Sequence, residues 1–336
     1  MLEKLIVLGG KGGVGKSSIS AATALRLGQL APDKKVLLIS FDIAHNLGDM
    51  FLKDVGNKVV QLHENVYGIE PDPDQFAEEF TAVFAEKMRQ LFMSTPLVKM
   101  VPKIEEYVMS QFQAKSIPLA LKNALFFQWL LNAEEYDFNY IVADFPPTGN
   151  MVALFEIPQN QVQVILKYTL QMFSQIRQAL KPLKKTMKIL NPFSWGKPEQ
   201  RALTDDIVRM LTELEARGER VTRMMKEIGS LRLVTISEKP SFEEIKRAAE
   251  MCKPYISLQA VHINKLIPED ALNCDFCATQ RVLQQKYLTQ IRDTFARYKI
   301  WESHALRVEP IGLDGLNVFA QEIYGNTPIG NILDPK

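Results

Sequence analysis

Short runs of valine, isoleucine and leucine recur along the chain, separated by longer stretches that mix apolar and polar residues. We expect these runs to form buried strands, because each is too short for a helix and is bounded by loop residues. They are Leu5–Leu8, Val36–Ser40, Tyr140–Ala143, Leu231–Ile236 and Val261–Ile263. Buried strands that alternate with helices are typical of a parallel sheet. The pattern therefore predicts an α/β fold with a doubly wound, mostly parallel sheet.

Two intervals between the predicted strands are too long for simple crossover helices. The first covers about residues 74–132, and the second covers about residues 161–229. In the second, Phe173, Ile176 and Leu180 begin an apolar series at steps of three and four residues, which is helical spacing. Methionines are frequent in and around both intervals, where they suit either core packing or a surface that accepts varied apolar segments. We expect a single domain over residues 1–336, with these two insertions forming an α-helical subdomain.

The amino-acid composition excludes some classes of protein. Hydrophobic residues make up 46% of the 336 residues, and 40 Lys+Arg stand against 39 Asp+Glu. This balance excludes a disordered chain and gives no global sign of nucleic-acid binding. Three cysteines are too few for a disulfide framework, and the sequence contains neither a signal-peptide pattern nor a run of roughly 18 apolar residues. We expect a cytoplasmic protein with no nucleic-acid partner.

Positive charge is concentrated in residues 167–201, where Glu199 is the only acidic residue. The basic residues are Lys167, Arg177, Lys181, Lys184, Lys185, Lys188, Lys197 and Arg201. Two interpretations stay open. The stretch is either a solvated helix face or a surface that contacts an anionic membrane or an acidic partner.

The strongest chemical signal is the segment GGKGGVGKSS, which follows the first predicted strand and opens a helical pattern. It contains the phosphate-binding pattern G-x-x-x-x-G-K-[ST], so it predicts a P-loop nucleotide-binding fold. Candidate nucleotide-binding residues are Gly10, Lys11, Gly12, Gly13, Val14, Gly15, Lys16, Ser17, Ser18 and, later in the chain, Asn264. We expect Lys16 to reach the β- and γ-phosphates and Ser17 to ligate Mg²⁺. The alternative is a plain glycine-rich turn.

Lys11 is a second lysine inside this loop, and phosphate binding alone does not require it. The loop resembles a deviant Walker A motif. That class implies that Lys11 reaches across a dimer interface to the partner's nucleotide and neutralises transition-state charge. The alternative is a solvated lysine.

Two aspartates follow predicted strands, and each is a candidate for the chemistry. We expect Asp42 to orient the attacking water, although a simple helix cap is the alternative. Asp144 has the Walker B arrangement and is expected to support Mg²⁺ through water. Residues near both aspartates are candidate switch positions that sense the γ-phosphate. They are His45, Asn46, Pro147, Thr148 and Gly149.

In combination, GKGGVGKS, A-H-N-L-x-D and D-x-x-P-T-G resemble the ArsA family of ATPases. The likeness continues through Gly68–Pro73, Val261–Asp270 and Cys274–Tyr287. It implies phosphate contacts from Gly12–Ser18, a cross-dimer role for Lys11, water activation by Asp42, metal support by Asp144 and adenine recognition by Asn264. The chain departs from the family pattern at Ile43, Phe145, Pro146 and Asn150. None of these departures removes a charged catalytic group, so we expect hydrolysis to survive.

The pair Cys274-x-x-Cys277 supplies two of the four ligands of a structural zinc site, so two chains would complete one. The branch of the family that targets tail-anchored membrane proteins implies such a dimer-bridging Zn²⁺. Two unliganded thiols or a bridging iron–sulfur cluster are the alternatives. Cys252 lies in an amphipathic pattern and is expected to be a small core residue. Because arsenite binding calls for more cysteines, the cysteine count favours the targeting branch over the arsenical pump.

These inferences lead to one expected function and several alternatives. We expect a homodimeric, Mg²⁺-dependent ATPase whose ATP-driven closure is coupled to binding and delivery of a hydrophobic membrane-protein segment. The main alternative is the energy-transducing subunit of an arsenite or anion efflux pump, with a membrane permease as partner. A membrane-positioning protein of the MinD type and an iron–sulfur reductase rank below these two.

Overall fold

The computed structural model describes residues 2–42, 47–72, 129–135, 137–155, 198–268 and 274–335, together with scattered positions between 75 and 106. The chain divides into two compact units. The first comprises Met1–Pro71, Leu130–Glu156 and Thr222–Lys336, and the second comprises Asp72–Trp129 and Ile157–Val221. The predicted single domain with two helical insertions stays a prediction. Much of both insertions, including Phe173, Ile176 and most of the basic stretch 167–201, lies outside the described residues.

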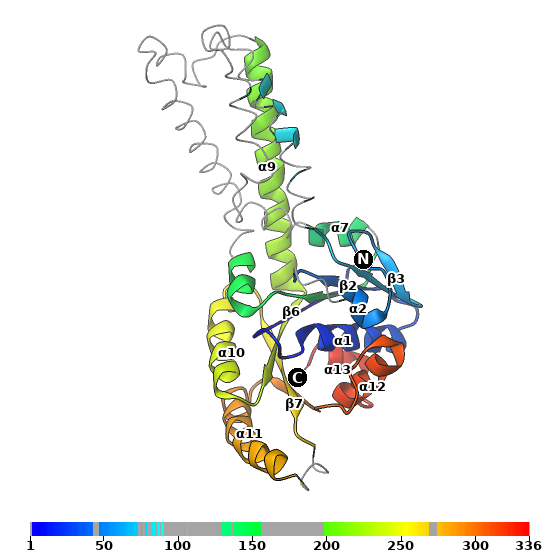
Figure 1. The fold of residues 1–336 in the computed structure, drawn as a ribbon. Helices are drawn as coiled ribbons and strands as arrows, with labels where there is room; N and C mark the ends of the chain where they lie inside the picture. Colours follow the sequence, from blue (N-terminus) through cyan, green and yellow to red (C-terminus); the bar gives the residue numbers. More distant parts are fainter. Residues whose placement is uncertain are drawn as a thin grey trace. The chain divides into compact units, whose positions relative to one another are not determined.

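The first unit is built on an eight-stranded sheet in the order β3-β4-β2-β5-β1-β6-β7-β8 (Figure 1). Every neighbouring pair is parallel except β3 with β4. The strands are β1 (Lys4–Gly10), β2 (Val36–Ser40), β3 (Val60–His63), β4 (Val66–Ile69), β5 (Tyr140–Asp144), β6 (Gly229–Ile236), β7 (Leu258–Leu266) and β8 (Lys299–His304). The predicted α/β class and mostly parallel sheet are confirmed.

The central strands are apolar because both of their faces are covered. Every residue of β1, β2 and β5 is buried, so these segments read as continuous hydrophobic runs rather than alternating ones. The edge strand β3 is short, carries polar residues and is bulged against β4 between Gln61 and His63. Such a strand has too few apolar positions for its pattern to predict it.

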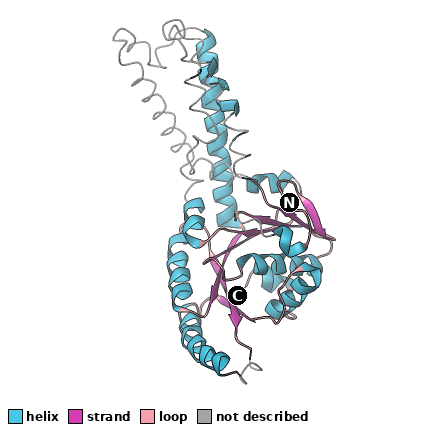
Figure 2. Ribbon diagram, viewed as in Figure 1, coloured by secondary structure: helices cyan, strands magenta, loops and turns pink. Residues whose placement is uncertain are grey.

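Helices cover the two faces of the sheet (Figure 2). The helices of the described residues are α1 (Lys16–Leu30), α2 (Leu47–Phe51), α7 (Trp129–Glu135), α9 (Pro198–Glu227), α10 (Lys239–Cys252), α11 (Asp275–Thr294), α12 (Gly312–Tyr324) and α13 (Ile329–Leu333). Residues of α9 up to Val221 belong to the second unit. Ile6 and Leu8 of β1 pack into one core with buried residues of α1 and α12, such as Ile19 and Phe319. α10 packs on β6 and β1, and α11 packs on β7. None of the helices in the described ranges combines the length and apolar character that crossing a membrane requires.

Candidate active site

The candidate nucleotide site lies at the carboxyl edge of the parallel strands. β1 ends at Gly10, where the P-loop begins, and the neighbouring strands β2 and β5 end at Ser40 and Asp144. Because parallel strands all point the same way, their loops meet at one edge of the sheet. A cavity of about 770 Å³ opens there, and Asp42 and Asn264 are among the residues that line it. The sequence-predicted P-loop, Asp42 and Asn264 are therefore brought together.

The P-loop takes a backbone conformation that depends on glycine. Gly13 has φ +82° and Gly15 has φ +92°, both in the left-handed region that side-chain-bearing residues rarely adopt. Gly15 precedes α1 directly, and its carbonyl accepts the first helical hydrogen bond from the Ile19 amide, at 3.0 Å. No acidic residue stands in the first turn of α1. The exposed helix amides and positive dipole end are therefore available to phosphate.

Lys16 is buried within this loop. Its side chain folds back so that Nζ donates to the carbonyl of Lys11, at 3.4 Å. Lys11 itself is half-buried and belongs to the loop, but it is not among the residues that line the cavity. The two predicted lysines therefore differ in setting: Lys16 lies in the cavity wall, whereas Lys11 lies beside it.

Asp144 is completely buried at the end of β5. Burial raises the pKa of its carboxyl to about 6, while a hydrogen bond from the Ser17 hydroxyl acts in the opposite direction. Its Oδ1 also accepts from Ser20 Oγ, at 3.4 Å. Its Oδ2 and the Oγ1 of Thr148 are buried polar atoms without a hydrogen-bond partner among the described residues. An unsatisfied carboxylate oxygen on the residue that Ser17 hydrogen-bonds suits Mg²⁺ and its water ligands, so Ser17 and Asp144 fit the metal.

The predicted switch positions are partly described. His45 and Asn46 lie outside the described residues. Pro147 follows Asp144 closely, and its ring approaches the P-loop, because a Cβ built on Gly12 would lie 3.9 Å from Pro147 Cγ. Helical residues begin at Thr148, and space around Gly149 is open. The D-x-x-P-T-G segment thus lies beside the P-loop.

Phe145 is one of the departures from the ArsA pattern, and the structure shows what it contacts. Its ring is fully buried, and the ring centroid lies 5.1 Å from that of Phe41 and 5.3 Å from that of Phe155. Phe41 directly precedes Asp42. The aromatic cluster therefore fixes the ends of β2 and β5 against each other, and this packing accounts for a large apolar residue at position 145.

The side chain of Asn264 is hydrogen-bonded to the P-loop. Its Nδ2 donates to the carbonyl of Val14, at 2.9 Å. Its Oδ1 accepts from the Lys265 amide at 2.8 Å and from Ser303 Oγ at 2.9 Å. In this conformation the amide that the resemblance assigns to adenine is engaged with the protein. Adenine recognition by Asn264 therefore stays a prediction.

Lys265 adds a contact that sequence reasoning missed. It has φ +59°, a left-handed conformation, and its Nζ donates to the carbonyl of Gly13, at 2.8 Å. Gln284 of α11 donates from Nε2 to the Lys265 carbonyl, at 3.1 Å. These bonds connect α11, the end of β7 and the P-loop. The only feature of the sequence that could have pointed to Lys265 is its position directly after the candidate nucleotide-binding residue Asn264.

Cys274 and Cys277 lie at the start of α11. The Cys277 amide donates to the Cys274 sulfur, at 3.5 Å, so Cys274 caps the helix. This hydrogen bond lowers the pKa of Cys274, whereas the hydrogen bond with Cys274 raises the pKa of Cys277. Cys274 is exposed and Cys277 is half-buried. The searched, described residues contain no group of three metal ligands, and this pair supplies two of the four ligands of a tetrahedral zinc site.

A family model described as anion-transporting ATPase matches residues 3–325. The chain belongs to this family. The match covers nearly the whole sequence and confirms the resemblance drawn from the motifs. As a member of this family, the chain is an ATP-hydrolysing enzyme, and its reaction uses ATP and Mg²⁺.

Proteins similar to this chain carry two kinds of name, arsenical pump-driving ATPase and ATPase GET3. The putative arsenical pump-driving ATPase 1 of Aquifex aeolicus is 26% identical, over 97% of this chain and 80% of the relative. The putative arsenical pump-driving ATPase of Chlorobaculum tepidum is 28% identical, over 98% and 78%. The ATPase GET3 of Komagataella phaffii is 26% identical, over 98% and 93%. At such similar identities, sequence similarity does not choose between the two names.

Proposed function

We propose that this ATPase acts as a cytoplasmic homodimer, in which ATP bound between facing subunits closes the dimer and hydrolysis reopens it. Closure would form an apolar surface in the helical insertions, and that surface would shield a membrane-protein segment from water until delivery. Burying such a segment gains roughly 25 cal/mol per Å² of apolar area, enough to bias two states of a dimer. The basic stretch 167–201 would provide peripheral contact with an anionic membrane.

The observation that carries the catalytic part is the convergence of Lys16, Ser17 and Asp144 at one edge of the sheet, with Asp42 lining the same cavity. The glycine-rich loop and Lys16 would bind the phosphates of ATP. Ser17 and Asp144 would hold Mg²⁺ through their oxygens, and the metal would neutralise charge on the β- and γ-phosphates.

Asp42 would orient the attacking water, because its carboxylate accepts hydrogen bonds and lies at the cavity wall. Lys11 would act on the nucleotide of the partner subunit. Its position beside the cavity, rather than in the cavity wall, agrees with a side chain that serves another subunit. Pro147, Thr148 and Gly149 would respond to the γ-phosphate, because this segment lies next to the P-loop.

Cys274 and Cys277 would contribute two sulfur ligands to one Zn²⁺ shared by the two subunits. The exposed start of α11 supports this proposal, because a shared site must lie at the surface of each chain. We expect one zinc per dimer by elemental analysis. Cys274→Ser should lower the zinc content and weaken the dimer in sedimentation, and full zinc retention would contradict the assignment.

Capture of membrane-protein segments tests the delivery function. The Asp42→Asn variant should hydrolyse ATP slowly and persist in the closed state, so it should retain bound clients when purified with ATP from its native cells. We expect mass spectrometry to find proteins with a transmembrane segment, and Phe173→Glu to abolish their capture. Val318→Glu, at an exposed position on α12, is the matched control and should leave capture intact. Recovery of soluble proteins alone would refute delivery.

The second candidate function is an energy-transducing subunit of an arsenite or anion pump, which the names of two relatives favour. The described residues give it little support, because Cys252 is completely buried and only Cys274 and Cys277 are accessible. Arsenite prefers several thiolates. Stimulation of ATP hydrolysis by arsenite would select this candidate, and co-purification of an integral permease would support it.

A further inference from the structure

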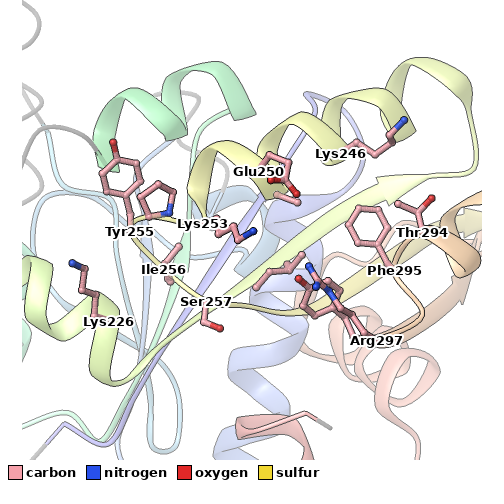
Figure 3. A pocket seen from close by; sticks show the side chains of 14 residues that line it. Lys226, Lys246, Glu250, Lys253, Tyr255, Ile256, Ser257, Thr294, Phe295 and Arg297 are labelled. Atoms are coloured by element: carbon pink, nitrogen blue, oxygen red, sulfur yellow. The ribbon is translucent and has the colours of Figure 1, made fainter.

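A second cavity lies in the first unit, and its volume is about 730 Å³ (Figure 3). Its walls come from the ends of α9, α10 and α11 and from the segments that precede β7 and β8. Leu258, the first residue of β7, lines it, whereas Asn264 lies near the other end of the same strand. Six residues of strand correspond to about 20 Å. The cavity is therefore at the amino edge of the sheet, away from the ATP site.

The rim of this cavity is positively charged. Lys226, Lys246, Lys253 and Arg297 line it, against Glu250 as the only acidic residue among the lining residues. Lys246 has a partner, because its Nζ lies 3.3 Å from Glu243. Across the described residues, Lys226, Lys253 and Arg297 form no ion pair with a carboxylate. The Cζ atom of Arg297 lies over the Tyr298 ring, 4.8 Å from its centroid. Three of the four lining cations, one at the end of α9 and two that follow α10 and α11, therefore have no carboxylate partner among the described residues.

Helix ends explain some of this charge but not the composition of the walls. Lys226 lies in the last turn of α9 and Lys253 follows α10, so both offset the negative ends of their helices. Between the cations the walls are apolar and aromatic, with Tyr255, Leu258 and Tyr298 half-buried. Walls that combine apolar and aromatic side chains with charged ones are typical of a protein-binding site.

The same helix ends indicate which anion fits. Compact phosphate sites use backbone amides at helix N-termini, whereas this cavity is bordered by the carboxyl ends of three helices, whose carbonyls repel a concentrated negative charge. The cations are instead spread over the cavity: Figure 3 shows Lys226 and Lys246 at opposite sides of the view, with Lys253 and Arg297 between them. Separate carboxylates along a peptide match this spacing better than a single phosphate group does.

We propose that this cavity binds an acidic segment of a partner protein, with an apolar side chain inserted between Tyr255 and Tyr298 and flanking carboxylates paired with Lys226, Lys253 and Arg297. This inference goes beyond the proposed ATPase cycle and does not depend on it. The surface lies outside the ATP site, so a partner could bind there while nucleotide is bound.

The test is selection of a phage library of random short peptides on the purified full-length chain, with counter-selection on a Lys253→Glu/Arg297→Glu double variant. We expect the enriched peptides to carry acidic residues on both sides of an apolar residue. In fluorescence anisotropy, a labelled enriched peptide should bind the double variant at least about tenfold more weakly and should lose affinity with added salt. Lys58→Glu, an exposed control in another part of the first unit, should bind as the wild type does.

Unchanged circular dichroism and ATPase rates would show that the double variant is folded. If it is not folded, Lys226→Gln/Arg297→Gln replaces it in the same selection. The proposal is overturned if no peptide is enriched over the counter-selection, or if the enriched peptides lack acidic residues. It is also overturned if glycine at the apolar position leaves affinity unchanged and inorganic pyrophosphate displaces the peptide, because the cavity would then be a small-anion site.

Discussion

Two glycines of the P-loop make a matched pair of substitutions. Gly13 and Gly15 both have positive φ, so alanine at either position costs about 1–2 kcal/mol of backbone energy. Their surroundings differ. A Cβ on Gly13 would meet nothing within 4 Å, whereas a Cβ on Gly15 would lie 2.4 Å from Asn264 Nδ2.

Asn264 cannot move away freely, because its amide holds the Val14 carbonyl, the Lys265 amide and Ser303. Either the clash remains or these bonds are lost, so Gly15→Ala should cost about 1–3 kcal/mol more than Gly13→Ala. In an Asn264→Ala background the side-chain amide is absent. There, the cost of Gly15→Ala should fall to that of Gly13→Ala.

The assay is urea unfolding followed by circular dichroism without nucleotide, so that contacts with phosphate do not enter the comparison. The wild type, Gly15→Ala, Asn264→Ala and the double variant form a double-mutant cycle, and Gly13→Ala is the control for backbone energy. Equal costs for Gly13→Ala and Gly15→Ala would refute the close packing of Asn264 on the P-loop. A cost of Gly15→Ala that is unaffected by Asn264→Ala would refute it as well.

Three further predictions concern other contacts. Lys265→Met removes the ammonium that donates to the Gly13 carbonyl, so steady-state kinetics should show a KM for ATP raised several-fold. An unchanged KM would mean that this bond does not hold the loop. Burial raises the pKa of Cys252 to about 12, so Ellman's reagent at neutral pH should modify two thiols in the folded, metal-free chain and three after denaturation; a third fast thiol would contradict this. Ile245→Ala removes most of a fully buried side chain on α10, so it should lower the free energy of unfolding, measured by urea unfolding, by about 2–5 kcal/mol. A loss below about 1 kcal/mol would show that the site collapses or is less packed than described.

The sequence predicted the elements whose signal is local. β1, β2 and β5 are buried on both faces, so they appear as short apolar runs, and the P-loop carries its function in consecutive residues. Asp144 could be assigned because it directly ends such a run. The positions of these residues at one edge of the sheet then follow from the parallel arrangement of the strands.

The features that escaped prediction depend on distant parts of the chain. β3 and β8 are the outermost strands of the sheet that the described residues form, and polar residues are tolerated in such strands. Lys265 contacts Gly13 across 252 positions of sequence, and no local pattern encodes such a contact. The basic cavity was missed for the same reason, because its cations come from three separate segments, in or shortly after α9, α10 and α11.

The central claim is that each ATP site is completed by Lys11 of the other subunit, and mixed dimers test it directly. Lys11→Met and Asp42→Asn homodimers should both be nearly inactive. Heterodimers isolated with two different affinity tags would contain one site with an intact Asp42 and an intact Lys11 from the facing subunit, so they should recover about half of the wild-type ATPase rate. Heterodimers as inactive as both parent variants would contradict the claim, since Lys11 would then serve the nucleotide of its own chain.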